Sequence, residues 1–371
     1  MSFALKSRKR VSSFIAITSA ASLVLVSACS SDSADGSTST EGGAGENETR
    51  VALVAGGPST YFTFWEAAGL EAQEEYGIQE VKYEVPPTPE YDPTIQINSI
   101  NSLLSAGYNA FGIFPDGATA LQTTYDKMEA QGIPVIDIGG CSEEPTAALF
   151  CLATDVKAAA YYETQELIKA MGGEGKIALL TGLLTDNNTI LRNEGVEEAV
   201  AETNGAVEIT QIISDIDTPN DAPAAVQSLL ANHGHELDGM ISPTYYPSVA
   251  AASIMMENPE YQDILFIGTD NDPTVMKAIQ EGAIYGTIYQ NSAGQATIAA
   301  YVLNRIVADG CEIAEDAPFD ETPQTTRFID SGYILVGQDD IEDYIGGPES
   351  IPEETERLLG EMDSYLTCPG E

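Results

Sequence analysis

The side chains best suited to chemistry follow the ends of predicted strands, and they suit hydrogen bonding more than bond breaking. They are hydroxyl, amide, carboxyl and aromatic groups, and histidine is missing from these segments. In open parallel sheets, ligands bind beyond the carboxyl ends of the strands, so these segments should face a common cleft. The segments are 56–62, 115–117, 139–140, 181–188, 243–246, 269–271 and 290–291.

Motifs that carry catalysis or hold cofactors are missing from the sequence. It contains no GxGxxG, P-loop or GxSxG pattern, which argues against dinucleotide, nucleotide and serine-hydrolase functions. The only histidines, His233 and His235, lie in a loop-like stretch, and no cysteine pair has CxxC spacing, so we expect no metal site and no cofactor. We expect no enzymatic activity; an extracellular carbohydrate-active enzyme, which would need a positioned base or metal, is the less favoured alternative.

The first residues predict export and lipid anchoring. A basic stretch at 6–10 precedes an apolar run at 11–26, which is typical of a secretory signal and short for a membrane span. The signal ends in Ser-Ala-Cys, which resembles a bacterial lipobox, so we predict a signal peptide at 1–28 and a lipid on Cys29. A signal that merely ends near a cysteine is the alternative. Residues 29–49 are rich in serine, glycine and acids and predict a flexible tether.

The charge of the chain excludes several partners. The formal net charge is −43, and four of the few basic residues lie in the signal segment. Such acidity repels nucleic acid and anionic membrane surfaces, so we expect neither as a direct partner, the lipid on Cys29 being the membrane contact. It also fits a saline habitat, where salt screens the self-repulsion.

The four cysteines beyond Cys29 predict two disulfides, because an even set in an exported chain favours disulfide bonds. Cys141 and Cys151 bracket a short loop, so we pair them with each other. Cys311 then ties the C-terminal tail through Cys368.

The chain from residue 50 onward alternates strand and helix, which predicts parallel sheets covered by helices on both faces. There are too many alternations for one ordinary sheet, so we predict an α/β fold of two doubly wound Rossmann-like lobes joined by a multi-strand hinge. We assign 50–140 and 291–327 to the first lobe, and 141–290 and 328–371 to the second. The predicted strands are 51–55, 79–85, 110–114, 133–138, 176–181, 207–213, 239–242, 264–268 and 283–289.

The order of several weak marks resembles the type I periplasmic binding proteins, the ribose- and galactose-binding group that feeds ABC importers. The resemblance runs from residue 51 to about residue 303, and each mark alone has little specificity. The marks are Tyr61-Phe62, Gln96, 133–135, Asp155, 192–195, 268–270 and 286–290.

The resemblance implies ligand-binding roles for three residues. Arg192 matches the arginine that hydrogen-bonds sugar oxygens, and its fork of donors suits paired acceptors; a surface arginine on the first turn of a helix is the alternative. Asp270 matches an aspartate that accepts from adjacent hydroxyls, although it could instead cap the following helix. Gln290 matches the glutamine at the hinge, and a simple turn residue is the alternative.

The remaining ligand-binding candidates either match the family loosely or depart from it. Tyr61 and Phe62 fall where the family places aromatic rings over a sugar, although either could pack the helix onto the sheet. Asp116 is displaced by one position from the family's aspartate. Gly139-Gly140 replaces a common Asp-Arg pair, and Tyr245 adds aromatic bulk where an Asn-Asp pair is common.

The resemblance implies an extracytoplasmic, lipid-anchored solute-binding protein on the outer face of the cell membrane or in the periplasm. We expect a monomer that closes on a sugar or polyol between its lobes and presents it to an ABC importer permease. A binding protein that senses the ligand for a membrane receptor is the alternative with the same fold.

Overall fold

The computed structural model describes residues 48–87, 92–344 and 351–370. The predicted signal peptide, the lipid site at Cys29 and most of the tether lie outside these residues. All described residues belong to one structural unit. None of the helices in the described ranges is long and apolar enough to span a membrane.

The first sheet has six parallel strands, and its centre is apolar. The strand order is β12-β5-β4-β3-β1-β2. The side chains of β1 alternate between the two faces, so Leu53 joins one core cluster and Val54 the other. The strands are β1 (Arg50–Val54), β2 (Glu80–Glu84), β3 (Ala110–Ile113), β4 (Val135–Ile138), β5 (Cys151–Ala153) and β12 (Phe328–Asp330).

The second sheet repeats this plan with one antiparallel strand at its edge. Its strand order is β13-β10-β9-β8-β6-β7, and only the pairing of β10 with β13 is antiparallel. The two α/β lobes of mostly parallel strands confirm the predicted fold class. The strands are β6 (Gly175–Leu180), β7 (Val207–Ile213), β8 (Gly239–Ile241), β9 (Leu265–Thr269), β10 (Gly286–Gln290) and β13 (Tyr333–Gly337).

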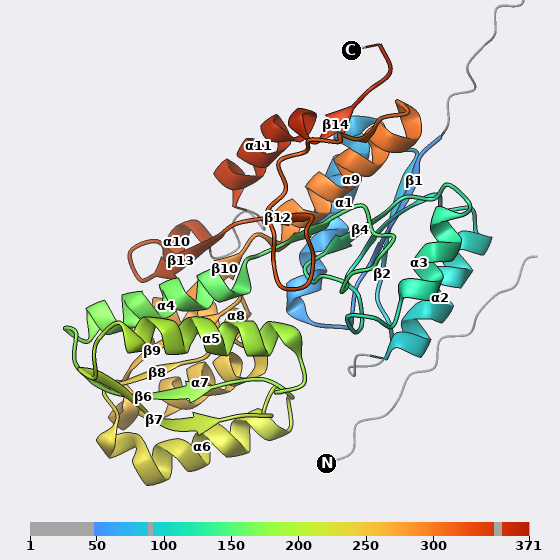
Figure 1. Ribbon diagram of the computed structural model, residues 1–371. Coiled ribbons are helices and arrows are strands. Elements are labelled where there is room, and N and C mark those ends of the chain that lie inside the picture. The colour runs from blue at the N-terminus through green and yellow to red at the C-terminus, as the bar shows by residue number, and fades with distance from the viewer. Residues whose placement is uncertain (1–47, 88–91, 345–350, 371) are drawn as a thin grey trace, which may run out of the picture. The chain divides into compact units, whose positions relative to one another are not determined.

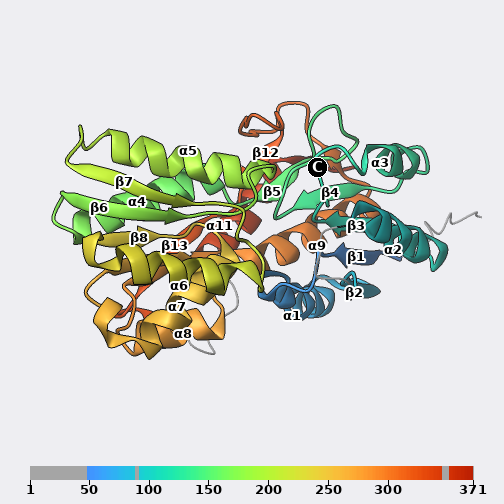
Figure 2. The ribbon, with the colours of Figure 1, turned by 90° about the horizontal axis from the view of Figure 1, so that it is seen from below.

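Helices cover both faces of each sheet (Figures 1 and 2). In the first lobe α1 and α9 lie on one face with α11, and α2 and α3 lie on the other. In the second lobe α4 and α5 cover one face, and α6, α7 and α8 the other. The helices are α1 (Thr60–Tyr76), α2 (Pro93–Ser105), α3 (Gln122–Glu129), α4 (Val156–Ala170), α5 (Asn187–Ala201), α6 (Asp221–His233), α7 (Tyr245–Glu257), α8 (Pro273–Gln280), α9 (Ser292–Ala308), α10 (Ile341–Tyr344) and α11 (Pro352–Glu361).

Short polar side chains cap several helices and so determine the residue at which each helix begins after a strand. Asp155 accepts hydrogen bonds from the backbone N–H groups at the start of α4, and Asp186 caps α5 in the same way. Asp272, and not Asp270, caps α8. The alternative that Asp270 caps the following helix is therefore wrong.

The chain passes between the lobes after β5, after β10, after β12 and again between α10 and α11, and this corrects two predicted boundaries. Cys151–Ala153 and Phe328–Asp330 were assigned to the second lobe, but both are strands of the first sheet. The tail was assigned to the second lobe as well. Its α11 instead packs in the first-lobe core beside α9. The remaining boundaries stay predictions.

Both predicted disulfides are present, Cys141–Cys151 and Cys311–Cys368. The second one joins the chain after α9 to the C-terminal segment, where β11 (Glu312–Ile313) pairs with β14 (Leu366–Thr367). This bond therefore holds the tail on the first lobe.

Candidate ligand-binding site

Arg192 lies at the centre of the candidate site. It lies on the second turn of α5 and is half-buried. The alternative of a surface arginine on the first turn of a helix therefore does not describe it. Its positive charge acts on Glu163, Asp217 and Asp270 of the second lobe and on Tyr61 of the first. Within the described residues its guanidinium makes no hydrogen bond and no ion pair shorter than 4.0 Å. Its donors therefore remain available to a ligand.

Asp270 lies directly after β9, in a backbone conformation that non-glycine residues seldom adopt. Its φ is 70°, and its backbone N–H donates to the Ile288 carbonyl at 2.8 Å. The Gln290 amide donates to its Oδ1 at 2.6 Å. Burial raises the pKa of Asp270 to about 6, and the Gln290 hydrogen bond and the Arg192 charge oppose that rise. Asp270 is thus a buried acceptor, and it is fully ionised only above about pH 7.

Tyr61 is the first-lobe residue that reaches this group. Its hydroxyl donates to Gln295 Oε1 at 2.7 Å, and burial raises its pKa. A Cβ atom at Gly139 would lie 3.1 Å from the Tyr61 hydroxyl, so the glycine makes room for the ring. The aromatic ring thus occupies space beside the glycine pair that replaces the family's usual Asp-Arg pair.

Tyr245 links the two lobes at the first turn of α7. Its hydroxyl donates to Asp272 Oδ2 at 2.7 Å, so it must accept from Thr60, whose Oγ1 lies 2.6 Å away on α1. Tyr245 therefore joins the first lobe to the strand-end loop that carries Asp270.

A small cavity in the second lobe opens beside Arg192 and Gln290. Its free space is close to that of one water molecule, so a sugar needs the surrounding side chains or lobes to move apart. One carboxyl group in its wall, that of Glu163, was not predicted from the sequence. The lining residues are Val156, Ala159, Ala160, Glu163, Arg192, Pro243, Thr269, Ile288 and Gln290.

Asp217 is a second residue that the sequence analysis did not select. It follows β7, accepts a hydrogen bond from the Tyr246 backbone N–H at 3.1 Å, and faces Arg192. Burial raises its pKa and the Arg192 charge opposes that rise. Its position after a strand end was the available signal.

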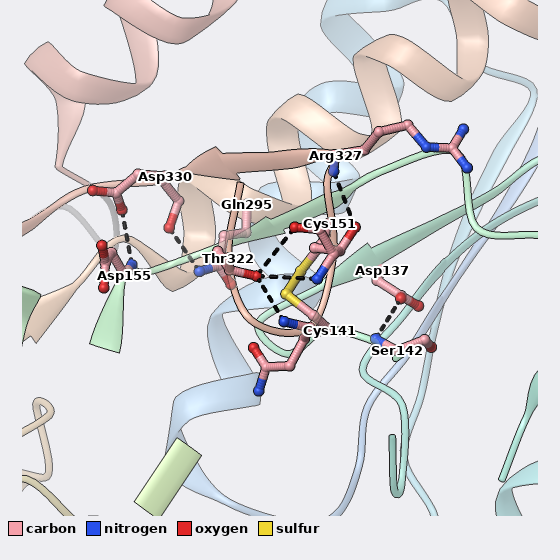
Figure 3. Close-up of a disulfide and its surroundings, with 12 residues drawn as sticks. Asp137, Cys141, Ser142, Cys151, Asp155, Gln295, Thr322, Arg327 and Asp330 are labelled. Carbon is pink, nitrogen blue, oxygen red and sulfur yellow. Dashed lines mark hydrogen bonds between the residues drawn. A yellow bond between two sulfur atoms is a disulfide. The ribbon is translucent and has the colours of Figure 1, made fainter. Parts of the chain in front are cut away.

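A second cavity lies between the lobes beside the Cys141–Cys151 disulfide. Figure 3 shows this disulfide and the residues around it. Asn188 and Leu191 of α5 line it from the second lobe, and Gly139 and Phe328 from the first. The disulfide is held on both sides, because the Cys151 N–H donates to the Arg327 carbonyl and Asp137 accepts from the Ser142 N–H, each at 2.8 Å. The disulfide and these hydrogen bonds together hold this wall of the cleft in place.

Phe62 belongs to the core, which corrects its assignment to the ligand site. Its side chain is 1% exposed and contacts the rings of Trp65 and Phe114 edge-on, with centroid distances of 5.1 Å to each. It lines neither cavity. Neighbouring residues of a helix point about 100° apart, and here Tyr61 reaches the Arg192 group while Phe62 packs into the core.

Asp116 is buried at the end of β3, apart from the Arg192 group. It is 2% exposed, and neither carboxyl oxygen has a hydrogen-bond partner among the described residues. The side chain of Gln96 positions its backbone, accepting from the Asp116 N–H at 3.0 Å and donating to the Phe114 carbonyl at 2.6 Å. Burial raises the pKa of Asp116 to about 7; the backbone N–H of Asp92 opposes that rise, and the smaller effect of the Asp92 charge adds to it.

Asp116→Asn is expected to stabilise the protein at alkaline pH. The pKa of Asp116 is about 7 in the folded protein against an ordinary 3.8, so its contribution to stability is complete below about pH 4 and falls as the pH rises through 7. An amide cannot ionise, so we expect a gain of about 2 kcal/mol near pH 8 after allowing for partial solvent screening, and almost none near pH 3. Urea unfolding at the two pH values measures the gain.

Asp126→Asn is the matched control, because Asp126 is an exposed acid on the neighbouring helix α3. We expect it to change the unfolding free energy by less than about 0.5 kcal/mol at either pH. A gain for Asp116→Asn of the same size at both pH values would show that ionisation of Asp116 does not limit stability.

Comparison with known proteins gives a consistent result. A family model described as periplasmic binding protein domain matches residues 51–310. The chain is 24% identical over 286 residues to the xylitol-binding protein of Mycolicibacterium smegmatis, with 71% of this chain and 79% of that protein covered.

Solved structures of sugar-binding proteins share the fold. A sugar-binding protein of a Bacillus halodurans sugar ABC transporter matches with a TM-score of 0.69 and 19% identity, over 80% of this chain and 99% of that one. An ABC transporter solute-binding protein of Actinobacillus succinogenes, with bound D-allose, has the same TM-score of 0.69 at 19% identity, over 80% of this chain and 100% of that one.

Proposed function

We propose, because this chain belongs to the periplasmic binding protein domain family, that it captures a sugar or sugar-like polyol between its lobes and delivers it to an ABC importer. The observation that carries the proposal is Arg192. Its half-buried guanidinium lies near the buried acceptor Asp270 and makes no short ion pair with any other residue that the structure describes. A polyol offers hydroxyl oxygens to the guanidinium and hydroxyl protons to the carboxylate.

The proposed site draws on both lobes. Arg192, Asp270 and Gln290 come from the second lobe, and Tyr61 comes from the first. A ligand that touches both lobes stabilises the closed arrangement by the difference between its contacts in the closed and open states. Tyr245 would support closure through its hydrogen bond to Thr60, and Asp116 would supply a further acceptor from the first lobe.

Anchoring and delivery complete the proposal. Members of this family work outside the cytoplasm, and the Ser-Ala-Cys ending of the signal supports a lipid on Cys29. The relatives described above include components of sugar ABC transporters, which supports an importer permease as the membrane partner. The protein would act as a monomer tethered through its first residues.

The test is a ligand panel on residues 50–371, the part with the described fold. Xylitol, D-ribose, D-allose, D-galactose and myo-inositol are added singly, with adenosine as a nucleoside for comparison, and thermal unfolding is recorded. A true ligand at about a hundred times its Kd should add about 2.7 kcal/mol of stability, an easily measured rise in Tm. Calorimetric titration then gives the Kd. A panel without any hit among the sugars and polyols would contradict the proposed solute class.

A further inference from the structure

Glu163 is the buried acid of the cavity wall. It stands on α4 after Val156, Ala159 and Ala160, at helical spacings of three, four and seven residues, so all four side chains share one face of the helix. The alanines are small, and they leave the space through which the cavity reaches the Glu163 carboxyl group. The side chain of Glu163 is 1% exposed.

The Glu163 carboxyl group lacks a partner for one of its oxygens. Its Oε1 is fully buried and makes no hydrogen bond within the described part of the chain. Buried polar groups are nearly always hydrogen-bonded in folded proteins, because leaving one unpaired costs about 1–3 kcal/mol. A buried, unpaired acid that lines a cavity therefore indicates a partner that occupies the cavity.

The groups packed around Glu163 favour its uncharged form. Arg192 faces it from α5 and Asp270 from the end of β9; the lining residues Pro243 and Ile288, from the segments after β8 and in β10, do not ionise. Burial raises the pKa of Glu163, Asp270 adds to that rise, and Arg192 opposes it, burial being the largest of the three effects. An uncharged carboxyl group has one O–H donor and one carbonyl acceptor.

We propose that Glu163 forms the inner end of the solute site, where its uncharged carboxyl group donates a hydrogen bond to an oxygen of the bound solute. This inference rests on the proposed function and narrows the ligand to an uncharged polyol or sugar whose inner end carries an acceptor oxygen. Arg192 then donates at one side of the solute and Asp270 accepts at the other. A cationic amine in the inner position could not accept the hydrogen bond from Glu163.

The experiment compares two substitutions at one position. Glu163→Gln keeps the shape and a donor, so we expect the Kd of the panel's best sugar or polyol to stay within about threefold of wild type at neutral pH. Glu163→Leu removes the donor, and we expect a loss of about tenfold or more. Glu166→Gln is the matched control, because Glu166 lies on the same helix and pairs with Lys169, and it should leave the Kd unchanged.

The pH dependence separates a binding role from a packing role. The wild-type affinity should fall as the pH rises through the raised pKa of Glu163 and this group loses its proton, and Glu163→Gln should lack that fall. Asp270 titrates in both proteins, so a change of affinity with pH that both profiles share belongs to Asp270, and a fall that wild type alone shows depends on Glu163. Equal profiles, or an unchanged Kd in Glu163→Leu, would overturn the inference.

Failure of the proposed function gives a different result. In that case no sugar or polyol binds wild type. The inference is then tested by the infrared difference spectrum between wild type and Glu163→Gln. A band of a protonated carboxyl group at neutral pH, lost in Glu163→Gln and shifted by any solute that enters the cavity, supports it. A carboxylate band overturns it.

Discussion

Arg192→Ala is expected to weaken solute binding about a hundredfold while the protein stays folded. The guanidinium is the one cation that acts on Glu163, Asp217 and Asp270 together among the described residues. Its removal takes away a charged donor and leaves neighbouring acids without an opposing charge. We expect a loss of about 3 kcal/mol, or about a hundredfold in Kd.

Calorimetric titration with the best solute of the panel measures this loss, and a cation elsewhere provides the control. Arg357→Ala removes an arginine of α11 that pairs with Glu354 and Glu361 on its own helix, and it should leave the Kd unchanged. Arg192→Lys keeps the charge without the planar fork and should bind with intermediate affinity. An Arg192→Ala protein with wild-type affinity would place the solute outside the Arg192 group.

The sequence predicted the alternation of elements well because long, regular segments carry strong signals. Val207–Ile213 appears with the predicted bounds, and both disulfides pair as expected. The short strands Cys151–Ala153 and Phe328–Asp330 were missed, since three residues show no periodicity. Their membership in the first sheet depends on pairing with each other across a long sequence separation, which no local pattern encodes.

The candidate site was predicted in part. Arg192, Asp270 and Gln290 were selected through the resemblance to the binding-protein family, and the structure brings them together. Glu163 was missed because it sits two turns inside a helix, where a glutamate normally faces solvent. Phe62 was misplaced because the sequence shows that two aromatics are adjacent, but not which one turns inward.

The hinge offers the second large effect, because one asparagine joins three of its segments. Asn291 follows β10, is fully buried, and its amide donates to the Ser331 carbonyl at 2.9 Å and to Thr355 Oγ1 at 3.0 Å. Its Oδ1 accepts from the N–H groups of Ile351, at 3.1 Å, and Gly294, at 3.2 Å. The side chain thus ties the crossing after β10 to the crossing after β12 and to the start of α11.

Asn291→Ala is therefore expected to lower the free energy of unfolding by about 4 kcal/mol. The substitution removes the cap of α9 and leaves several buried backbone groups without partners, each of which costs about 1–3 kcal/mol. Urea unfolding measures the loss. Asn304→Ala, on the same helix, removes a single hydrogen bond to the Tyr76 carbonyl and should cost only about 1 kcal/mol.

Solute binding shows whether Asn291 also sets the hinge. Asn291 makes none of its hydrogen bonds to the Arg192 group, so a purely structural role predicts an unchanged Kd for the protein that remains folded. If its contacts fix the angle between the crossing segments, their loss lets the open arrangement gain population, and the apparent affinity falls by the fraction of closed protein that is lost. We expect such a fall, of about threefold to tenfold, because Asn291 and Ser331 lie on two different crossings and their hydrogen bond holds those crossings together. If Asn291→Ala loses stability as expected but binds the solute with wild-type affinity, the hydrogen bonds of Asn291 serve folding alone.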